Sequence, residues 1–197
     1  MPARKKPNNK LVYQLKVTLR DIRPPIWRRI QVVSDMTLYE LHWALQTVMG
    51  WSNSHLHEFM IFDNAYGDPK MDEASDVEDE RVVKLGDVIS DEKETFHYMY
   101  DFGDCWEHEI LVEKILPVGK GVRYPVCVTG KRSCPPEDCG GATGYEELLA
   151  ALGDTSHPDH DDLFDWLPGD FDSEKFDVEA VNRRLRPSGT RPRNPLH

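Results

Sequence analysis

The segment from Phe96 to Glu109 constrains the fold more strongly than any other part of this 197-residue chain. Large aromatic, apolar or imidazole side chains recur at every second position on both sides of a short break, at Phe96, Tyr98, Tyr100 and Phe102 and then at Trp106, His108, Ile110 and Val112. Because successive side chains of a strand point to opposite faces, this period of two predicts two strands with one apolar face each. The Gly103-Asp104 pair between them predicts a tight turn, so we expect an aromatic hairpin.

The residues before this hairpin predict a second hairpin and a helix. Alternating apolar residues over 11–19 and 26–33 are typical of two strands, which we expect to pair. Thr37 and Glu40 have the spacing of a capping box, and an apolar stripe with helical spacing follows them up to Gly50. A helix of about thirteen residues is therefore predicted to end at that glycine.

The remaining segments indicate shorter elements. Residues 55–62 predict a strand, the acidic stretch between Asp72 and Glu80 a solvated loop, and residues 124–141 a loop rich in cysteine, proline and glycine. Three helix starts follow, at Thr143 with Glu146, at Pro158 and at Asp177. This order predicts an α+β fold with an antiparallel or mixed sheet, a helix after the first hairpin and a C-terminal helical segment.

The net charge of −11 is unevenly distributed. Residues 1–20 contain six lysines and arginines and residues 183–197 contain five arginines, whereas neither segment contains an acidic residue. Residues 21–182 therefore keep 13 of the 24 basic residues against all 35 acidic ones, a net charge of −22. Such a body repels phosphate, so we expect at most weak, salt-dependent nucleic-acid binding through the tails.

Prolines and polar residues fill residues 1–9 and 187–197, which predicts two disordered basic tails around a single domain of residues 10–186. No apolar run in the sequence has the length of a membrane span, and the N-terminus has the charge of a signal peptide without its apolar region. We therefore expect a cytoplasmic protein without a membrane partner. In that compartment its four cysteines are thiols or metal ligands rather than disulfides.

One candidate metal site lies in the loop of residues 124–141. Zinc is the cofactor that this set allows, with Cys127, Cys134 and Cys139 as ligands and His157 or His160 completing a tetrahedron. Alternatively, the prolines and glycines build the turn and the thiols pack as small apolar groups. The cysteine spacing departs from that of common zinc motifs, so we expect packing and no cofactor.

A second candidate site lies on the predicted strands. His55 and His57 share a strand face, and His108 would add a third imidazole from a neighbouring strand. A metal-dependent hydrolase would use these three histidines with Asp101 or Asp104 as base, so that Asp101, Asp104 and His108 are the candidate catalytic residues. Alternatively, the histidines are structural and hydrogen-bonded.

The aromatic hairpin also offers a candidate binding surface. Its members are the aromatic and imidazole side chains of Trp51, His55, His57, Tyr98, Tyr100 and Trp106. A cluster of this kind recognises ligands through ring contacts, but the same residue types more often form a core. The sequence leaves both alternatives open.

Taken with these elements, the chain resembles the plasmid pRiA4b Orf-3-like family, whose domain is also described as an insertion-element passenger TnpR protein. The resemblance rests mainly on four groups of segments, which are Ile26 to Ile30 with Leu38 to His42, Gly50 to Phe59, Tyr98 to His108, and Cys134 to Gly141 with Gly144 to Glu146. It implies an α+β domain across most of the chain and a link to mobile DNA. It implies no established activity.

The TnpR description would imply recombinase chemistry, and the residues do not support it. A serine resolvase needs a nucleophilic hydroxyl beside arginines, on a Tyr-x-Arg-x-Ser strand near the N-terminus. The corresponding strand here, from Tyr13 to Val17, lacks both the arginine and the serine. We therefore expect a binding or interaction module with an unknown protein or small-molecule partner, and a hydrolase or a nucleic-acid accessory protein are the alternatives.

We predict that residues 10–186 fold without the two tails, because every periodic apolar segment lies within them. A truncated protein of these residues should unfold cooperatively, with a melting temperature close to that of the full chain. Differential scanning calorimetry of both proteins tests this. Loss of the cooperative transition in the truncated protein would refute the domain boundaries.

Overall fold

A computed structural model describes residues 10–70, 77–167, 169 and 171–186 of the chain. Within these residues the elements follow in the order β1 (Leu11–Leu19), β2 (Trp27–Val33), α1 (Leu38–Met49), β3 (His57–Ile61), β4 (Asn64–Gly67), β5 (Glu78–Asp79), α2 (Leu85–Val88), β6 (Thr95–Tyr100), β7 (Trp106–Pro117), β8 (Val126–Lys131), α3 (Gly141–Gly153), α4 (His160–Trp166) and α5 (Val178–Arg184). The two expected tails and residues 71–76 of the acidic stretch lie outside the described residues.

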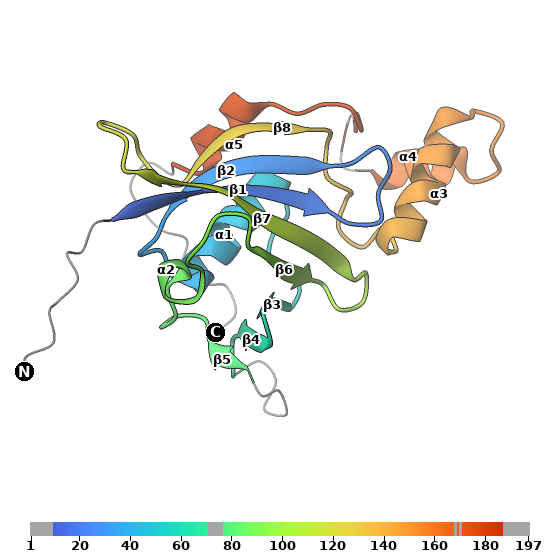
Figure 1. Cartoon of the computed structure of the whole chain (residues 1–197). Helices are drawn as coiled ribbons and strands as arrows, with labels where there is room; N and C mark the ends of the chain where they lie inside the picture. The colour runs from blue at the N-terminus through green and yellow to red at the C-terminus, as the bar shows by residue number, and fades with distance from the viewer. Residues whose placement is uncertain (1–9, 71–76, 168, 170, 187–197) are drawn as a thin grey trace, which may run out of the picture.

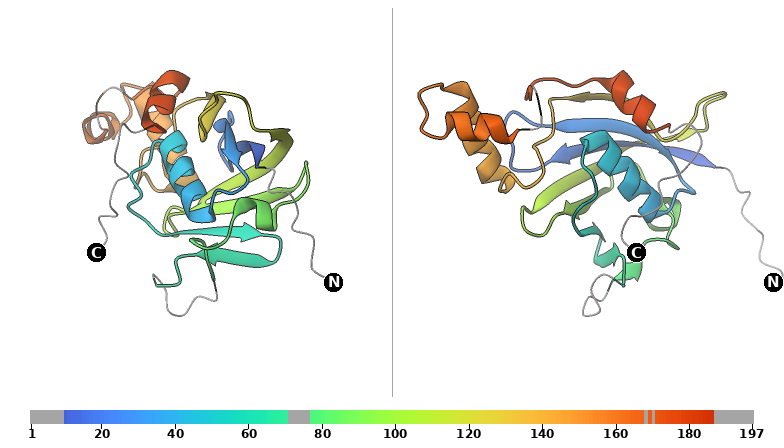
Figure 2. Two further views of the ribbon diagram at one scale, coloured as in Figure 1. Left: turned by 90° about the vertical axis from the view of Figure 1, so that its left-hand side faces the viewer. Right: turned by 180° about the vertical axis from the view of Figure 1, so that it is seen from behind.

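The strands form one mixed sheet in the order β5-β4-β3-β6-β7-β1-β2-β8. All neighbouring pairs are antiparallel except β4 and β5, which are parallel. The sheet is twisted and curves around α1, while α3 and α4 lie together at one end of the molecule (Figures 1 and 2). The predicted α+β class and the predicted β1–β2 hairpin are therefore confirmed.

Helix α1 fills the concave side of the sheet, and its ends are those that the sequence predicts. The Thr37 hydroxyl accepts a hydrogen bond from the Glu40 backbone, and the Glu40 carboxylate accepts one from the Thr37 backbone. Its apolar stripe is buried, including Leu38, Leu41 and Leu45 at 0% exposure. The helix ends at Gly50, whose φ of 97° lies in the left-handed region that glycine adopts without strain.

The aromatic hairpin forms from β6 and β7, with Tyr98 opposite His108 and Tyr100 opposite Trp106. The prediction of a tight turn at Gly103-Asp104 is wrong. The connection runs from Asp101 to Cys105, the two residues whose φ is positive, and the Cys105 amide donates to the Asp101 carbonyl at 2.6 Å. Phe102 therefore leaves the buried face and is 52% exposed, contrary to the alternation.

Other local predictions fail because tertiary pairing decides the structure. Strand β8 forms within the expected loop of residues 124–141, since β2 offers it an edge to pair with. Strand β5 forms within the acidic stretch by pairing with β4. Helix α3 begins at Gly141 without a side-chain cap, so the predicted capping box of Thr143 and Glu146 is absent.

The core contains two buried histidines, His42 on α1 and His108 on β7, each at 0% exposure. Burial lowers the pKa of His108 to about 4. Burial also lowers the pKa of His42 well below its ordinary value, and the neighbouring His57 lowers it further. Both imidazoles are thus held neutral in the folded protein at pH 7.

We predict that the protein loses stability as the pH falls from about 6.5 to about 4, because the unfolded chain protonates His108 near pH 6.5 and the folded chain only near pH 4. The contribution of His108 is fully present above pH 6.5, and its loss amounts to about 3 kcal/mol at 1.4 kcal/mol per pKa unit. Urea unfolding at about pH 7 and about pH 4.5 measures the fall. His108→Gln, which stays neutral, should show a smaller fall, and an equal fall in both proteins would contradict the prediction.

A second prediction concerns the end of α1. Gly50→Ala should lower the free energy of unfolding by about 1 kcal/mol, because alanine is strained at a positive φ and no neighbouring atom lies within 4 Å of the added methyl group. Gly153→Ala at the end of α3 is the matched control, since its surroundings are equally open and its φ lies outside that region. The control should be neutral or stabilising, and equal losses in both variants would count against left-handed strain as the cause.

Candidate functional site

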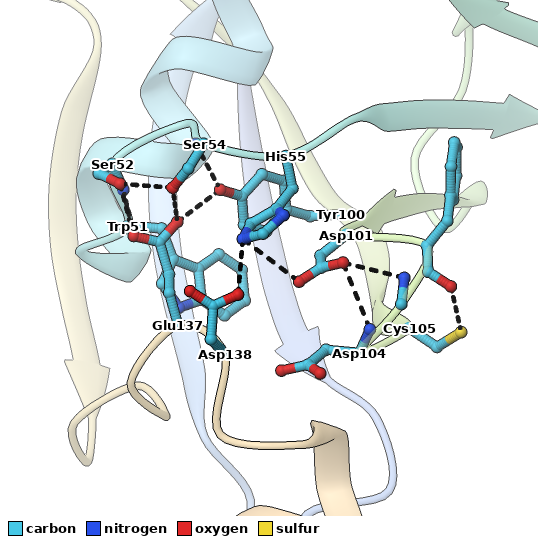
Figure 3. Close-up of polar contacts among 12 residues, drawn as sticks. Trp51, Ser52, Ser54, His55, Tyr100, Asp101, Asp104, Cys105, Glu137 and Asp138 are labelled. Atoms are coloured by element: carbon cyan, nitrogen blue, oxygen red, sulfur yellow. Dashed lines mark hydrogen bonds and ion pairs between the residues drawn. The ribbon is translucent and has the colours of Figure 1, made fainter. Parts of the chain in front are cut away.

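Three loops that are distant in the sequence meet at one end of the aromatic hairpin. We call this region the three-loop site and define it as residues 51–55 after α1, 101–105 between β6 and β7, and 135–141, which lead into α3 (Figure 3). The Trp51 indole donates to the Pro135 carbonyl at 3.0 Å, and the Gly140 amide donates to the Asp104 carboxylate at 3.2 Å. Each loop is therefore directly hydrogen-bonded to at least one of the others.

Trp51 supports the site from beneath. Its ring stacks on Tyr100, with 5.0 Å between the ring centroids, and meets the His108 ring edge-on at 5.3 Å. It also packs against Trp106 at 5.9 Å and is itself 8% exposed. The indole thus joins the first loop to both strands of the hairpin.

Glu137 organises the centre of the site. Its carboxylate accepts hydrogen bonds from the Ser52 amide at 3.1 Å, the Ser52 hydroxyl at 2.6 Å, the Ser54 hydroxyl at 3.1 Å and the Tyr100 hydroxyl at 2.5 Å. Burial on its own raises the pKa of this carboxyl, but the donors from Ser52, Tyr100 and Ser54 outweigh it and hold the pKa below its usual range. Glu137 is therefore an ionised structural acceptor, with four hydrogen bonds to one side chain.

Asp101 organises the hairpin connection. It is 7% exposed, and its Oδ1 atom accepts hydrogen bonds from the backbone amides of Gly103 at 2.9 Å and Asp104 at 3.3 Å. Its φ of 58° lies in the left-handed region, which aspartate tolerates better than most residues. These bonds fix the carboxylate so that its other oxygen, Oδ2, faces His55 (Figure 3).

His55, Asp101 and Asp138 form the one group of three potential metal-ligating side chains within the described residues whose ligand atoms all lie within 4.8 Å of one another. The Nε2 atom of His55 lies 3.0 Å from Asp138 Oδ1 and 3.5 Å from Asp101 Oδ2. Asp138 projects into solvent, with 69% of its side chain exposed, whereas the Asp101 side chain is 10% exposed. The group is therefore open to solvent on the side of Asp138 and buried on the side of Asp101.

The loops approach so closely that one position requires glycine. A Cβ atom at Gly141 would lie 2.5 Å from the Asp104 carbonyl oxygen, and the φ of this glycine is 69°. Any other residue would push the third loop away from the hairpin connection and separate Asp138 from Asp101.

The structure does not bring the expected histidine set together as one set of ligands. His57 begins β3 and stacks on His42, with ring centroids 3.5 Å apart, while its Nε2 lies 2.9 Å from a carboxylate oxygen of the buried Glu80. His108 lies in the core with Nδ1 3.1 Å from the Tyr98 carbonyl. His55 precedes the strand, so the period of two does not apply to it, and its partners are carboxylates instead.

The expected aromatic surface is part of the core. Trp51, Tyr98, Tyr100 and Trp106 are each at most 8% exposed, so these four side chains cannot form an exposed face. Tyr98 instead receives a hydrogen bond from Gln46 at 3.0 Å and lies 2.8 Å from His42 Nδ1. His42 was not among the predicted site residues, although its position within the apolar stripe of α1 indicated a buried side chain.

The candidate cysteines are free thiols, and the structure does not gather them with His157 and His160 into a group of three ligand atoms among the described residues. Burial raises the pKa of Cys127 to about 11 and those of Cys134 and Cys139 to about 12. His160 Nδ1 lies 2.8 Å from the Ala151 carbonyl. Zinc binding by this set stays a hypothesis that no contact in the structure supports.

A shallow hollow of about 570 Å³ on the sheet is a weaker candidate. It is lined by Gln14, Arg29, Lys93, Leu111, Val112, Glu113, Lys114 and Val128. Two of its charged side chains neutralise each other, because Arg29 donates two hydrogen bonds to Glu113 at 2.6 and 2.7 Å. The three-loop site has carboxylates that no arginine or lysine in the described part of the chain pairs with in this way.

None of the helices in the described residues combines the length and the apolar character of a membrane-spanning segment.

Comparisons with known proteins give one family model and two similar proteins. The model of the family described as plasmid pRiA4b ORF-3-like protein matches residues 11–180. The uncharacterized protein y4hQ of Sinorhizobium fredii is 38% identical over 176 residues, which cover 88% of this chain and 90% of that protein. The crystal structure of MM3350 from Methanosarcina mazei Go1, a protein of unknown function, has a TM-score of 0.80 and 43% identity, covering 86% of this chain and 97% of that one. This chain therefore belongs to the plasmid pRiA4b ORF-3-like family.

Proposed function

We propose that this protein is a binding module that holds a cationic ligand, or a cationic group of a partner, at the three-loop site. The observation that carries the proposal is a surplus of carboxylates, since Asp101, Asp104, Glu137 and Asp138 all belong to this site. Among the described residues no lysine or arginine forms an ion pair with any of them, and His55 is the single nitrogen base that does. Carboxylates held together without cations attract a positive ligand.

A role in binding rather than in catalysis is favoured by the state of these carboxylates. A general acid or base works best with a pKa near the working pH, whereas hydrogen bonds keep the pKa of Glu137 low. Asp101 uses one oxygen to hold the backbone of its own turn. The hydrolase alternative required His55, His57 and His108 in one ligand set, and these three do not form one.

The nucleic-acid alternative rests on residues 1–9 and 187–197, which lie outside the described residues. The net charge of −22 over residues 21–182 supports a cationic ligand over a phosphate backbone. We further propose that the protein acts in the cytoplasm, which its four free thiols support. A context in mobile DNA is supported by the family's plasmid description alone.

The test is a series of melting curves with cationic probes. Spermidine, argininamide, a tetralysine peptide and Mn²⁺ are each added to the full-length protein. At least one should raise the melting temperature of the wild type, by about 5 to 10 °C at a concentration near 100 times its dissociation constant. The double variant Asp104→Asn/Asp138→Asn should lose this shift, because two carboxylates of the site become neutral amides of the same size.

Asp161→Asn/Asp162→Asn is the matched control, since it removes the same charge from two exposed residues of α4. It should keep the full shift. If both double variants lost the shift equally, net charge alone would explain it and the proposal would be wrong. It would also be wrong if no probe raised the melting temperature of the wild type.

A further inference from the structure

We infer that His55, Asp101 and Asp138 are three ligands of one divalent transition-metal ion. The inference rests on the proposed function and names the cation that the three-loop site takes. Each ligand comes from a different loop, so that the ion would join the end of α1, the hairpin connection and the segment before α3 (Figure 3).

The spacing of the ligand atoms fits a common metal. Nitrogen and oxygen ligands lie about 2.0 to 2.2 Å from ions such as Zn²⁺, and two ligands about 90° to 110° apart around the ion are then about 3.0 to 3.5 Å from each other. His55 Nε2 lies 3.0 Å from Asp138 Oδ1 and 3.5 Å from Asp101 Oδ2. Both distances match the edges of such a coordination shell.

The contacts of His55 Nε2 with the carboxylates of Asp101 and Asp138 do not have hydrogen-bond geometry. His55 Nε2 is a buried atom without a hydrogen-bond partner in the described part of the structure, although two carboxylates lie close to it. A buried nitrogen that lacks a well-directed partner is unfavourable for the fold. A metal ion at the point that the nitrogen and the two oxygens share would remove this cost.

Asp101 supplies the second, independent observation. Its side chain is nine-tenths buried, and both of its hydrogen bonds from the described residues end on Oδ1. Oδ2 receives none from these residues and is directed at His55. Metal-binding carboxylates are oriented in this way, with one oxygen held by outer-shell donors and the other left for the ion.

The ligand types indicate which metals fit. An imidazole favours zinc, iron, nickel or copper over Mg²⁺ and Ca²⁺, and two carboxylates extend the range to Mn²⁺. Three protein ligands leave at least one coordination position open. Because Asp138 is 69% exposed, this position faces solvent, where water or a donor group of a partner would complete the shell.

The experiment titrates the full-length protein with Mn²⁺ and follows the signal of the free ion by electron paramagnetic resonance. Mn²⁺ is chosen because it prefers oxygen and nitrogen ligands to thiols. The wild type should bind about one ion per chain in a saturable manner. Asp138→Asn and His55→Gln should each weaken the affinity at least about tenfold, the loss that follows disturbance of a metal's ligand environment.

Two control variants distinguish this site from exposed carboxylates elsewhere and from the cysteine loop. Asp63→Asn makes the same chemical change at an exposed turn beyond the far end of β3, and Cys134→Ser removes the thiol of the alternative zinc site. Both should bind Mn²⁺ as the wild type does, and Zn²⁺ measured by equilibrium dialysis should follow the same pattern. Far-ultraviolet circular dichroism and melting temperatures verify that each variant is folded.

The inference is overturned if the wild type binds no Mn²⁺ or Zn²⁺ in a saturable manner, if Asp138→Asn binds both as tightly as the wild type, or if Zn²⁺ binding is lost in Cys134→Ser alone. The proposed function would survive each of these results if an organic cation still stabilised the wild type and not Asp104→Asn/Asp138→Asn. The two failures are therefore distinguishable.

Discussion

The three-loop site depends on the indole of Trp51. Its ring lies against Tyr100 and Trp106 of the hairpin, and its one donor bonds to the Pro135 carbonyl of the third loop. A buried indole of this kind contributes a large apolar area and one directional bond. The ring contacts hold the first loop against the hairpin, and the hydrogen bond holds the third loop against the first. Without this side chain the first loop would lose its buried anchor on the hairpin.

Two adjacent acidic residues in the third loop have different roles, one structural and one available for binding. Glu137 is turned inward and accepts four hydrogen bonds, so that its carboxylate oxygens find their donors within the protein. Asp138 has a φ of 62°, which turns its side chain away from that network and towards His55. One carboxylate assembles the loops, and the next remains available to a ligand.

The sequence predicts the elements that local patterns determine. The capping residues of α1, the pairing of β1 with β2 and the buried faces of the aromatic hairpin all follow from spacing that a single segment contains. Strand β8 and the partners of His55 cannot be predicted in this way, because each depends on a segment that is distant in the sequence. Asp101 and His55 were predicted as site residues, but Glu137 and Asp138 were visible only as part of the motif around Cys134. The alternation that placed His55 and His57 on one face holds only within a strand, and β3 begins at His57.

The thiols near the site can be compared with His55, Asp101 and Asp138 as ligands for a metal ion. A cysteine must lose its proton to ligate, and each pKa unit above the working pH costs about 1.4 kcal/mol. Burial raises the pKa of Cys127 to about 11 and that of Cys134 to about 12, so both thiols are harder to deprotonate near pH 7 than an exposed cysteine. The bond to a soft metal has to offset this cost, and a hard ion such as Mn²⁺ gains too little from sulfur to do so. Ligation by His55, Asp101 and Asp138 requires no thiol deprotonation, which makes these residues the favoured ligands for such ions.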